Sequence, residues 1–125
     1  MDMVNSKGWM AAMKRRQTNV LETETVAGDG SNLSTTIPVS LLTPSGTEAM
    51  ILPPPDDAEG SKGQVKHVIY RSGSGTITLR AQEADASTTS VQIVLDTAGE
   101  GGTFLWSGLG WECISGDANV AQTGE

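Results

Sequence analysis

The sequence predicts an all-β protein, a compact antiparallel β-sandwich or jelly-roll-like barrel of about eight short strands with an extended N-terminal arm. Runs in which apolar and polar residues alternate recur at roughly 8–12-residue intervals, as in sandwiches and barrels. Clusters of glycine, proline, serine and asparagine separate these runs. After residue 19, no segment has the apolar spacing of about 3.6 residues that marks a helix.

The strand signals are interrupted at recognisable places. Pro38 divides the second run, which predicts an edge strand or a bulge, because proline cannot donate to the ladder. Pro53-Pro54-Pro55 ends the third run for the same reason. Ser72-Gly73-Ser74-Gly75 predicts a hairpin turn. The expected strands cover residues 20–26, 35–42, 49–52, 64–71, 76–81, 89–95, 102–106 and 111–116.

The last two runs form an aromatic hairpin. Phe104, Trp106 and Trp111 are three of the five aromatic residues, and the turn Gly108-Leu109-Gly110 joins the two strands. This bulk predicts the centre of the core. Cys113 follows Trp111 by two positions, so both side chains point to one face of the strand. We therefore expect Cys113 to be a buried structural thiol.

The chain divides into three segments: an N-terminal arm over residues 1–19, a β domain over residues 20–116 and a flexible tail over residues 117–125. The arm carries four bases and one acid, a net charge of +3, whereas residues 20–125 carry four bases and fourteen acids, a net charge of −10. A basic arm on an acidic body predicts docking on an acidic partner. The acidic body argues against nucleic-acid binding.

The arm is either a short amphipathic helix, an extended segment that orders against a partner, or a frayed terminus. No run approaches the roughly 20 apolar residues of a membrane span. The N-terminus also lacks the pattern of a signal peptide. We therefore expect a protein synthesised in the cytoplasm that does not associate with membranes.

The residues indicate no catalytic, cofactor or metal site, and the protein is not expected to be an enzyme. One histidine, His67, and one cysteine, Cys113, are too few for a zinc site. His67 lies inside an expected strand and is interpreted as structural. The acidic run Asp56 to Gly60 lacks the ligand spacing of an EF-hand and is interpreted as a solvated loop. Trp106 and Trp111 are candidates for stacking on sugars, although their place in an apolar hairpin favours a core role.

Several motifs follow one another along the chain: Ile51-Leu52-Pro53-Pro54, Gly63-Gln64-Val65-Lys66-His67-Val68-Ile69-Tyr70, Ser72-Gly73-Ser74-Gly75, Thr76-Ile77-Thr78-Leu79, Phe104-Leu105-Trp106 and Gly110-Trp111 with Ile114-Ser115-Gly116. Their order resembles structural proteins of tailed bacteriophages: head decoration (cement) proteins, head fibres and the β modules of tail fibres. The resemblance covers about residues 33–116, and it implies a homotrimer.

The resulting hypothesis is a capsid decoration protein on the exterior of the virion, whose partner is the major capsid protein. The arm would clamp the capsid through basic and apolar residues: Lys7, Trp9, Met10, Met13, Lys14, Arg15 and Arg16. The alternative is a receptor- or glycan-binding module of a phage fibre or spike, which predicts that Trp106 or Trp111 is exposed to solvent.

Overall fold

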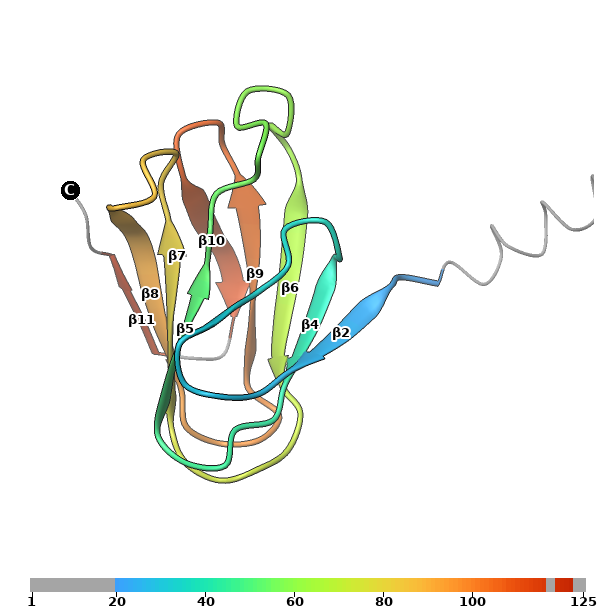
Figure 1. The fold of residues 1–125 in the computed structure, drawn as a ribbon, viewed down its shortest axis with the longest axis vertical. Helices are drawn as coiled ribbons and strands as arrows, with labels where there is room; N and C mark the ends of the chain where they lie inside the picture. The colour runs from blue at the N-terminus through green and yellow to red at the C-terminus, as the bar shows by residue number, and fades with distance from the viewer. Residues whose placement is uncertain (1–19, 117–118, 123–125) are drawn as a thin grey trace, which may run out of the picture.

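The computed structural model describes residues 20–116 and 119–122, and these residues form strands and turns without a helix (Figure 1). The all-β prediction is confirmed. One five-stranded sheet has the order β10-β9-β6-β4-β2, and the other has the order β11-β8-β7-β5-β3. The first contains β2 (Thr23–Val26), β4 (Val39–Leu42), β6 (Val65–Tyr70), β9 (Gly101–Trp106) and β10 (Trp111–Gly116); the second contains β3 (Ser31–Asn32), β5 (Glu48–Leu52), β7 (Ile77–Gln82), β8 (Thr89–Leu95) and β11 (Asn119–Gln122).

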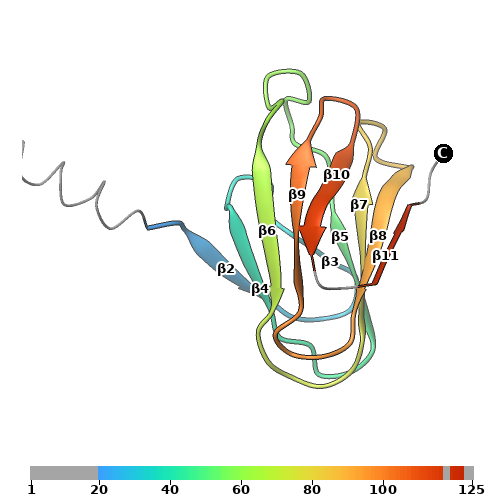
Figure 2. The same ribbon diagram turned by 180° about the vertical axis from the view of Figure 1, so that it is seen from behind.

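From β2 to β7 the chain alternates between the two sheets (Figures 1 and 2). As a result, β2, β4 and β6 are parallel neighbours in the first sheet, and β3, β5 and β7 are parallel neighbours in the second. Each pair of consecutive strands, one in each sheet, forms one turn of the winding, and each such turn stacks on the preceding one. The later strands pair antiparallel: β8 with β7, β9 with β6, β10 with β9 and β11 with β8.

This topology corrects several expectations. The sheets are mixed rather than antiparallel, and they are two open sheets rather than a barrel. Ser72–Gly75 joins no hairpin, because it carries the chain from β6 in one sheet to β7 in the other. The second predicted strand begins only after Pro38, and β4 lies inside its sheet instead of at an edge. In the segment 117–125, where no strand was expected, β11 pairs with β8.

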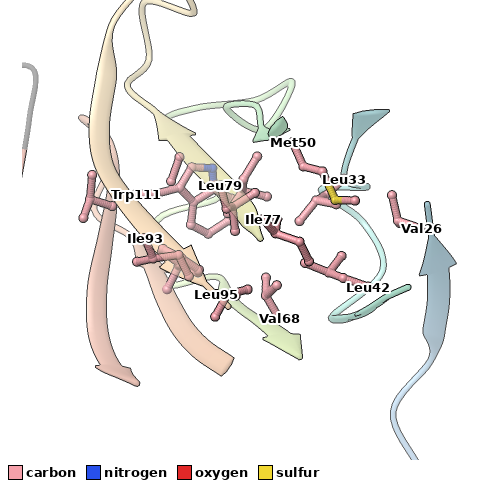
Figure 3. Packing of buried hydrophobic residues seen from close by; sticks show 14 of the residues in the cluster. Val26, Leu33, Leu42, Met50, Val68, Ile77, Leu79, Ile93, Leu95 and Trp111 are labelled. Atoms are coloured by element: carbon pink, nitrogen blue, oxygen red, sulfur yellow. The ribbon is translucent and has the colours of Figure 1, made fainter. Parts of the chain in front are cut away.

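The two sheets face each other across one apolar core (Figure 3). The alternation predicted for β7 and β8 is confirmed, because Ile77, Leu79, Val91, Ile93 and Leu95 are all fully buried. The first sheet contributes the aromatic residues. The cluster contains Val26, Leu33, Leu42, Met50, Leu52, Val68, Tyr70, Ile77, Leu79, Ala81, Val91, Ile93, Leu95, Phe104, Trp106 and Trp111, with Ala58 and Cys113 packed against it.

The aromatic hairpin also holds the longest connection in place. The rings of Trp106 and Trp111 meet edge to face with their centroids 5.3 Å apart, and both side chains are fully buried. Trp106 Nε1 donates a hydrogen bond to the Ala58 carbonyl (2.6 Å), and Trp111 Nε1 donates to the Pro53 carbonyl (2.8 Å). Each indole therefore buries its ring while its N–H is satisfied by the loop between β5 and β6.

At the opposite end of the strands, the connection from β4 to β5 touches the connection from β6 to β7. Ser45 and Ser74 form an isolated parallel bridge, and Tyr70 Oη donates to the Gly75 carbonyl (2.8 Å). Gly75 has a φ of +94°, and a Cβ there would lie 2.2 Å from the carbonyl oxygen of Gly46. The stacking of successive turns of the winding thus requires a residue without a side chain at this position.

We predict that Gly75→Ala destabilises the protein by at least about 3 kcal/mol, because it combines backbone strain with a clash against backbone atoms. Gly30→Ala is the matched control, since Gly30 has a φ of +83° and open space around its Cβ position. That variant should lose only about 1 kcal/mol. Urea unfolding followed by circular dichroism measures both values. Equal losses in the two variants would show that the close contact has no energetic role.

Candidate functional site

Strand β6 has two chemically different sides. Lys66, Val68 and Tyr70 are buried, whereas Val65 and Ile69 are 37% and 38% exposed. The alternation of the sequence indicates this division of the strand into two sets, but it does not show which set faces the interior. The lysine side of β6 faces the interior, and the more apolar side faces solvent.

The strands beside β6 continue this side of the sheet, although Val39 on β4 is itself buried, with 8% exposure. His67 lies opposite Val39 on β4 and Thr103 on β9, and Ile69 lies opposite Leu41 on β4. Residues opposite each other in a ladder point to the same side of the sheet. We call this surface the β6 face; it consists of Val39, Leu41, Val65, His67, Ile69, Thr103 and Leu105.

A shallow hollow of about 530 Å³ lies at one end of the β6 face. Its depth reflects glycines at positions where other residues would carry side chains. A Cβ on Gly101 would lie 2.6 Å from the Val68 carbonyl oxygen, and a Cβ on Gly116 would lie 2.8 Å from the Gly101 carbonyl oxygen. The lining residues are Leu21, Val39, His67, Val68, Ile69, Gly99, Gly101, Gly102, Thr103 and Gly116.

The β6 face contains no residue with a formal charge when His67 is neutral. Adjacent β2 adds the exposed threonines Thr23 and Thr25, which lie opposite Val39 and Leu41. On the other side, adjacent β10 places Glu112 opposite Leu105, at the edge of the face. On the second sheet, by contrast, exposed Arg80 donates a hydrogen bond to Gln92 across the β7–β8 pair (3.3 Å). An uncharged surface is unusual for a protein with a net charge of −7.

His67 is the one titratable side chain that lines the hollow. Its Nδ1 lies 3.1 Å from Oγ1 of Thr103, within hydrogen-bond distance. No carboxylate is among the lining residues to orient the imidazole for acid–base catalysis. Within the described part of the chain, no three His, Cys, Asp or Glu side chains gather into a potential metal site. The lining of the hollow thus consists mainly of apolar side chains and glycines.

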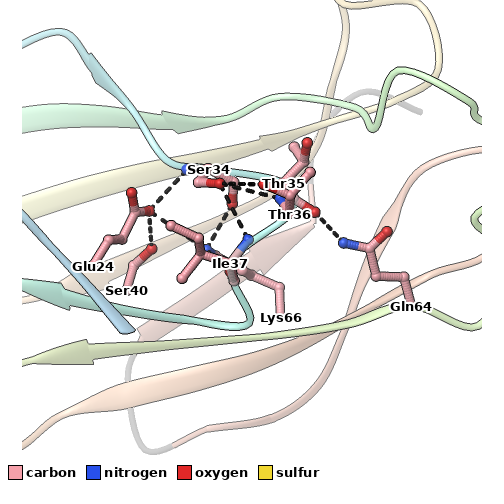
Figure 4. A network of polar contacts seen from close by, with 8 residues as sticks. All are labelled: Glu24, Ser34, Thr35, Thr36, Ile37, Ser40, Gln64 and Lys66. Atoms are coloured by element: carbon pink, nitrogen blue, oxygen red, sulfur yellow. Dashed lines mark hydrogen bonds and ion pairs between the residues drawn. The ribbon is translucent and has the colours of Figure 1, made fainter. Parts of the chain in front are cut away.

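On its inner side, β6 is anchored by a buried ammonium group (Figure 4). The Lys66 side chain is fully buried, and its Nζ donates to the carbonyl oxygens of Ser34 (2.7 Å) and Ile37 (2.6 Å). Glu24 Oε2 lies 3.6 Å from Nζ and also accepts hydrogen bonds from Ser34 N (2.8 Å) and Ser40 Oγ (2.5 Å). The ammonium thus joins the segment before β4 to β2 and β6, which support the β6 face.

Burial lowers the pKa of Lys66 below its ordinary value of 10.5, and the neighbouring carboxylate of Glu24 opposes this effect only in part. The desolvation cost follows from moving a charge out of water, and the three acceptors around Nζ offset it. A second anchor lies close by, where Gln64 Nε2 donates to the Thr35 carbonyl.

The structure places the other sequence-predicted residues as follows. Trp106 and Trp111 are fully buried, so their interpretation as core residues is confirmed.

Cys113 is partly buried against the core, and this desolvation raises its pKa. The segment from Asp56 to Gly60 is a turn between β5 and β6, and Asp57 Oδ1 accepts a hydrogen bond from Gly60 N (2.9 Å). Among the described residues, no helix is long and apolar enough to cross a membrane.

The predicted capsid-binding residues of the arm, which include Lys7, Trp9 and Arg16, lie outside the described residues. The β6 face was not recognised from the sequence as a site. Its signal is the alternation of Val65, His67 and Ile69, which indicates a shared face without showing on which side of the sheet that face lies.

Comparison with protein-family models finds no match for this chain, and a search of curated proteins finds no significant relative.

We predict that Lys66→Met lowers the free energy of unfolding by about 3 kcal/mol, because the Ser34 and Ile37 carbonyls and the Glu24 carboxylate lose a buried donor. Lys62→Met is the matched control, since the Lys62 side chain is 56% exposed and pairs only with exposed Glu59. Its effect should stay within about 0.5 kcal/mol. Chemical denaturation measures both. A stable Lys66→Met variant would mean that methionine packing compensates for the lost network.

We further predict a pH dependence that identifies the direction of the Lys66 pKa shift. Because the folded-state pKa is lowered, the unfolded state binds more protons between that pKa and 10.5. The stability of the wild type should therefore rise relative to Lys66→Met as the pH increases through this window. Unfolding curves of both proteins over an alkaline pH series test this. A relative loss of wild-type stability would mean that the ion pair with Glu24 outweighs burial.

Proposed function

We propose that this protein acts by binding other proteins, as a capsid decoration (cement) protein on the outer surface of a bacteriophage head. The observation that carries the proposal is the β6 face, an uncharged and partly apolar surface on an otherwise acidic body. Contiguous apolar surface on a soluble protein is typical of an interaction site. The hollow in the face adds a shape that another subunit can fill, and its lining lacks the paired titratable groups of catalysis.

The proposal also includes the architecture of the protein: a β-sandwich with an N-terminal arm attached beside β2. Two open sheets around one core support the sandwich. The arm would contact the major capsid protein, with its basic residues pairing with acids and Trp9, Met10 and Met13 filling an apolar groove. The protein would bind as a homotrimer, and its acidic surface would face solvent.

The stabilising mechanism is mass action. A protein that binds the assembled lattice and not its separated subunits stabilises the lattice by an amount set by its concentration relative to Kd. A rigid body suits this role, and the buried tryptophan pair and the polar anchor at Lys66 provide that rigidity. Binding requires no chemical step.

The alternative role, a glycan-binding fibre module, depended on exposed tryptophan rings. Trp106 and Trp111 are fully buried, and both indole N–H groups are already bonded to loop carbonyls. They offer no platform on which a sugar ring can stack. No other observation on the described residues favours glycan binding over protein binding.

We predict that deleting residues 1–18 leaves a folded body that no longer binds capsids. The described core begins after this segment, so circular dichroism and thermal unfolding should match the full-length protein. Co-sedimentation with undecorated phage heads measures binding. Full-affinity decoration by the truncated protein would refute the role of the arm.

The charge contribution is tested separately with Lys14→Glu, Arg15→Glu and Arg16→Glu combined in one variant. Its control makes the same change in net charge on exposed bases of the body, at Lys62, Arg71 and Arg80. The arm variant should lose capsid binding while the body variant retains most of it. An equal loss in both would show that net charge alone governs the interaction.

A further inference from the structure

We propose that the β6 face is the surface on which a second copy of this chain packs. The proposal rests on the function above only in treating this face as a protein-binding surface, and it names the partner. It holds for the purified protein without any capsid, so the two ideas can fail independently.

Half of the exposed large apolar side chains of the described residues lie on strands of the first sheet. Among the described residues, the exposed large apolar side chains are Val20, Leu21, Val65, Ile69, Leu109 and Ile114. Val65 and Ile69 belong to the β6 face, and Leu21 lines its hollow. Ile114 lies on β10 of the same sheet, at the bulge between Cys113 and Ser115. Val20 and Leu109, each 79% exposed, lie outside this surface.

The charge distribution identifies a second copy as the occupant. Residues 20–125 carry a net charge of −10, so two copies repel each other through most of their surface. The repulsion is smallest where each copy presents no charge, and the β6 face meets that condition across β4, β6 and β9. A strongly basic partner would instead be matched by several carboxylates, whereas a single one, Glu112 on β10, lies opposite a residue of the β6 face, Leu105. Self-association is therefore the contact that the pattern of charge favours.

The position of the arm supports the same occupant. The arm joins the described chain at Val20, and the next residue, Leu21, lines the hollow in the β6 face. A segment with a net charge of +3 is therefore attached to the body beside the proposed contact, and its bases would oppose the repulsion between two acidic bodies. Nineteen residues can extend over roughly 60 Å, far enough to reach a neighbouring copy.

The test is the mass of the purified full-length protein, measured by sedimentation velocity over a series of concentrations. The wild type should associate. Ile69→Asp and Val65→Asp should each weaken association by at least about 30-fold, because a buried unpaired carboxylate would enter every contact between copies. Leu109→Asp is the matched control: Leu109 is 79% exposed and lies on a turn, so this variant should associate like the wild type.

Thermal unfolding of each variant, together with the uncharged variant Ile69→Gln, separates loss of contact from loss of folding. A wild type that is monomeric at every concentration would overturn the proposal. So would association that Ile69→Asp and Leu109→Asp affect equally, or association that depends on residues 1–18 and not on Ile69. A monomer whose capsid binding is lost in Ile69→Asp would assign the face to the capsid protein, leaving the decoration function intact.

Discussion

Each connection from β2 to β7 crosses from one sheet to the other, and this winding constrains the rest of the structure. It makes every second strand a parallel neighbour, so β4 and β6 lie side by side although 22 residues separate them. Consecutive turns must then stack closely, which explains the missing side chain at Gly75. The antiparallel strands β8 to β11 extend both sheets on the other side, and β9 brings its threonine and leucine beside β6. The β6 face exists only because this winding brings the uncharged outer sides of three strands together.

The same winding explains why Lys66, Val68 and Tyr70 of β6 face the interior while Val65 and Ile69 face solvent. A strand at the centre of its sheet has to bury one side, and burial of Val68 and Tyr70 brings Lys66 inside with them. The lysine is tolerated because the segment before β4 presents two carbonyl oxygens and Glu24 supplies a carboxylate. The same orientation of β6 therefore buries the charge of Lys66 and exposes the apolar side chains of Val65 and Ile69.

Much of the fold could be predicted from the sequence. Alternation identified β6, β7 and β8, and the bulk of Trp106 and Trp111 identified the centre of the core. Alternation specifies which residues share a face, but it carries no information about which strands pair, so parallel pairing and the sheet crossing at Ser72–Gly75 were missed. The candidate face was missed for the related reason that Val65 and Ile69 are as apolar as core residues. Only the acceptors around Lys66, contributed by distant segments, determine which side is inside.

A decoration protein needs many weak contacts that act together, and the proposed self-association provides a physical route to them. If copies meet through the β6 face, the arms that begin at its rim are gathered on one side of the assembly. Once the first arm binds, the others do so at a high effective concentration, so avidity can exceed the affinity of any single arm. The charge pattern suits this arrangement, because the basic segment of the sequence is attached at Val20, next to Leu21 of the hollow, while most acidic residues belong to the body. On this view the β6 face and the arm act together, because self-association through the face determines how many arms bind the capsid at once.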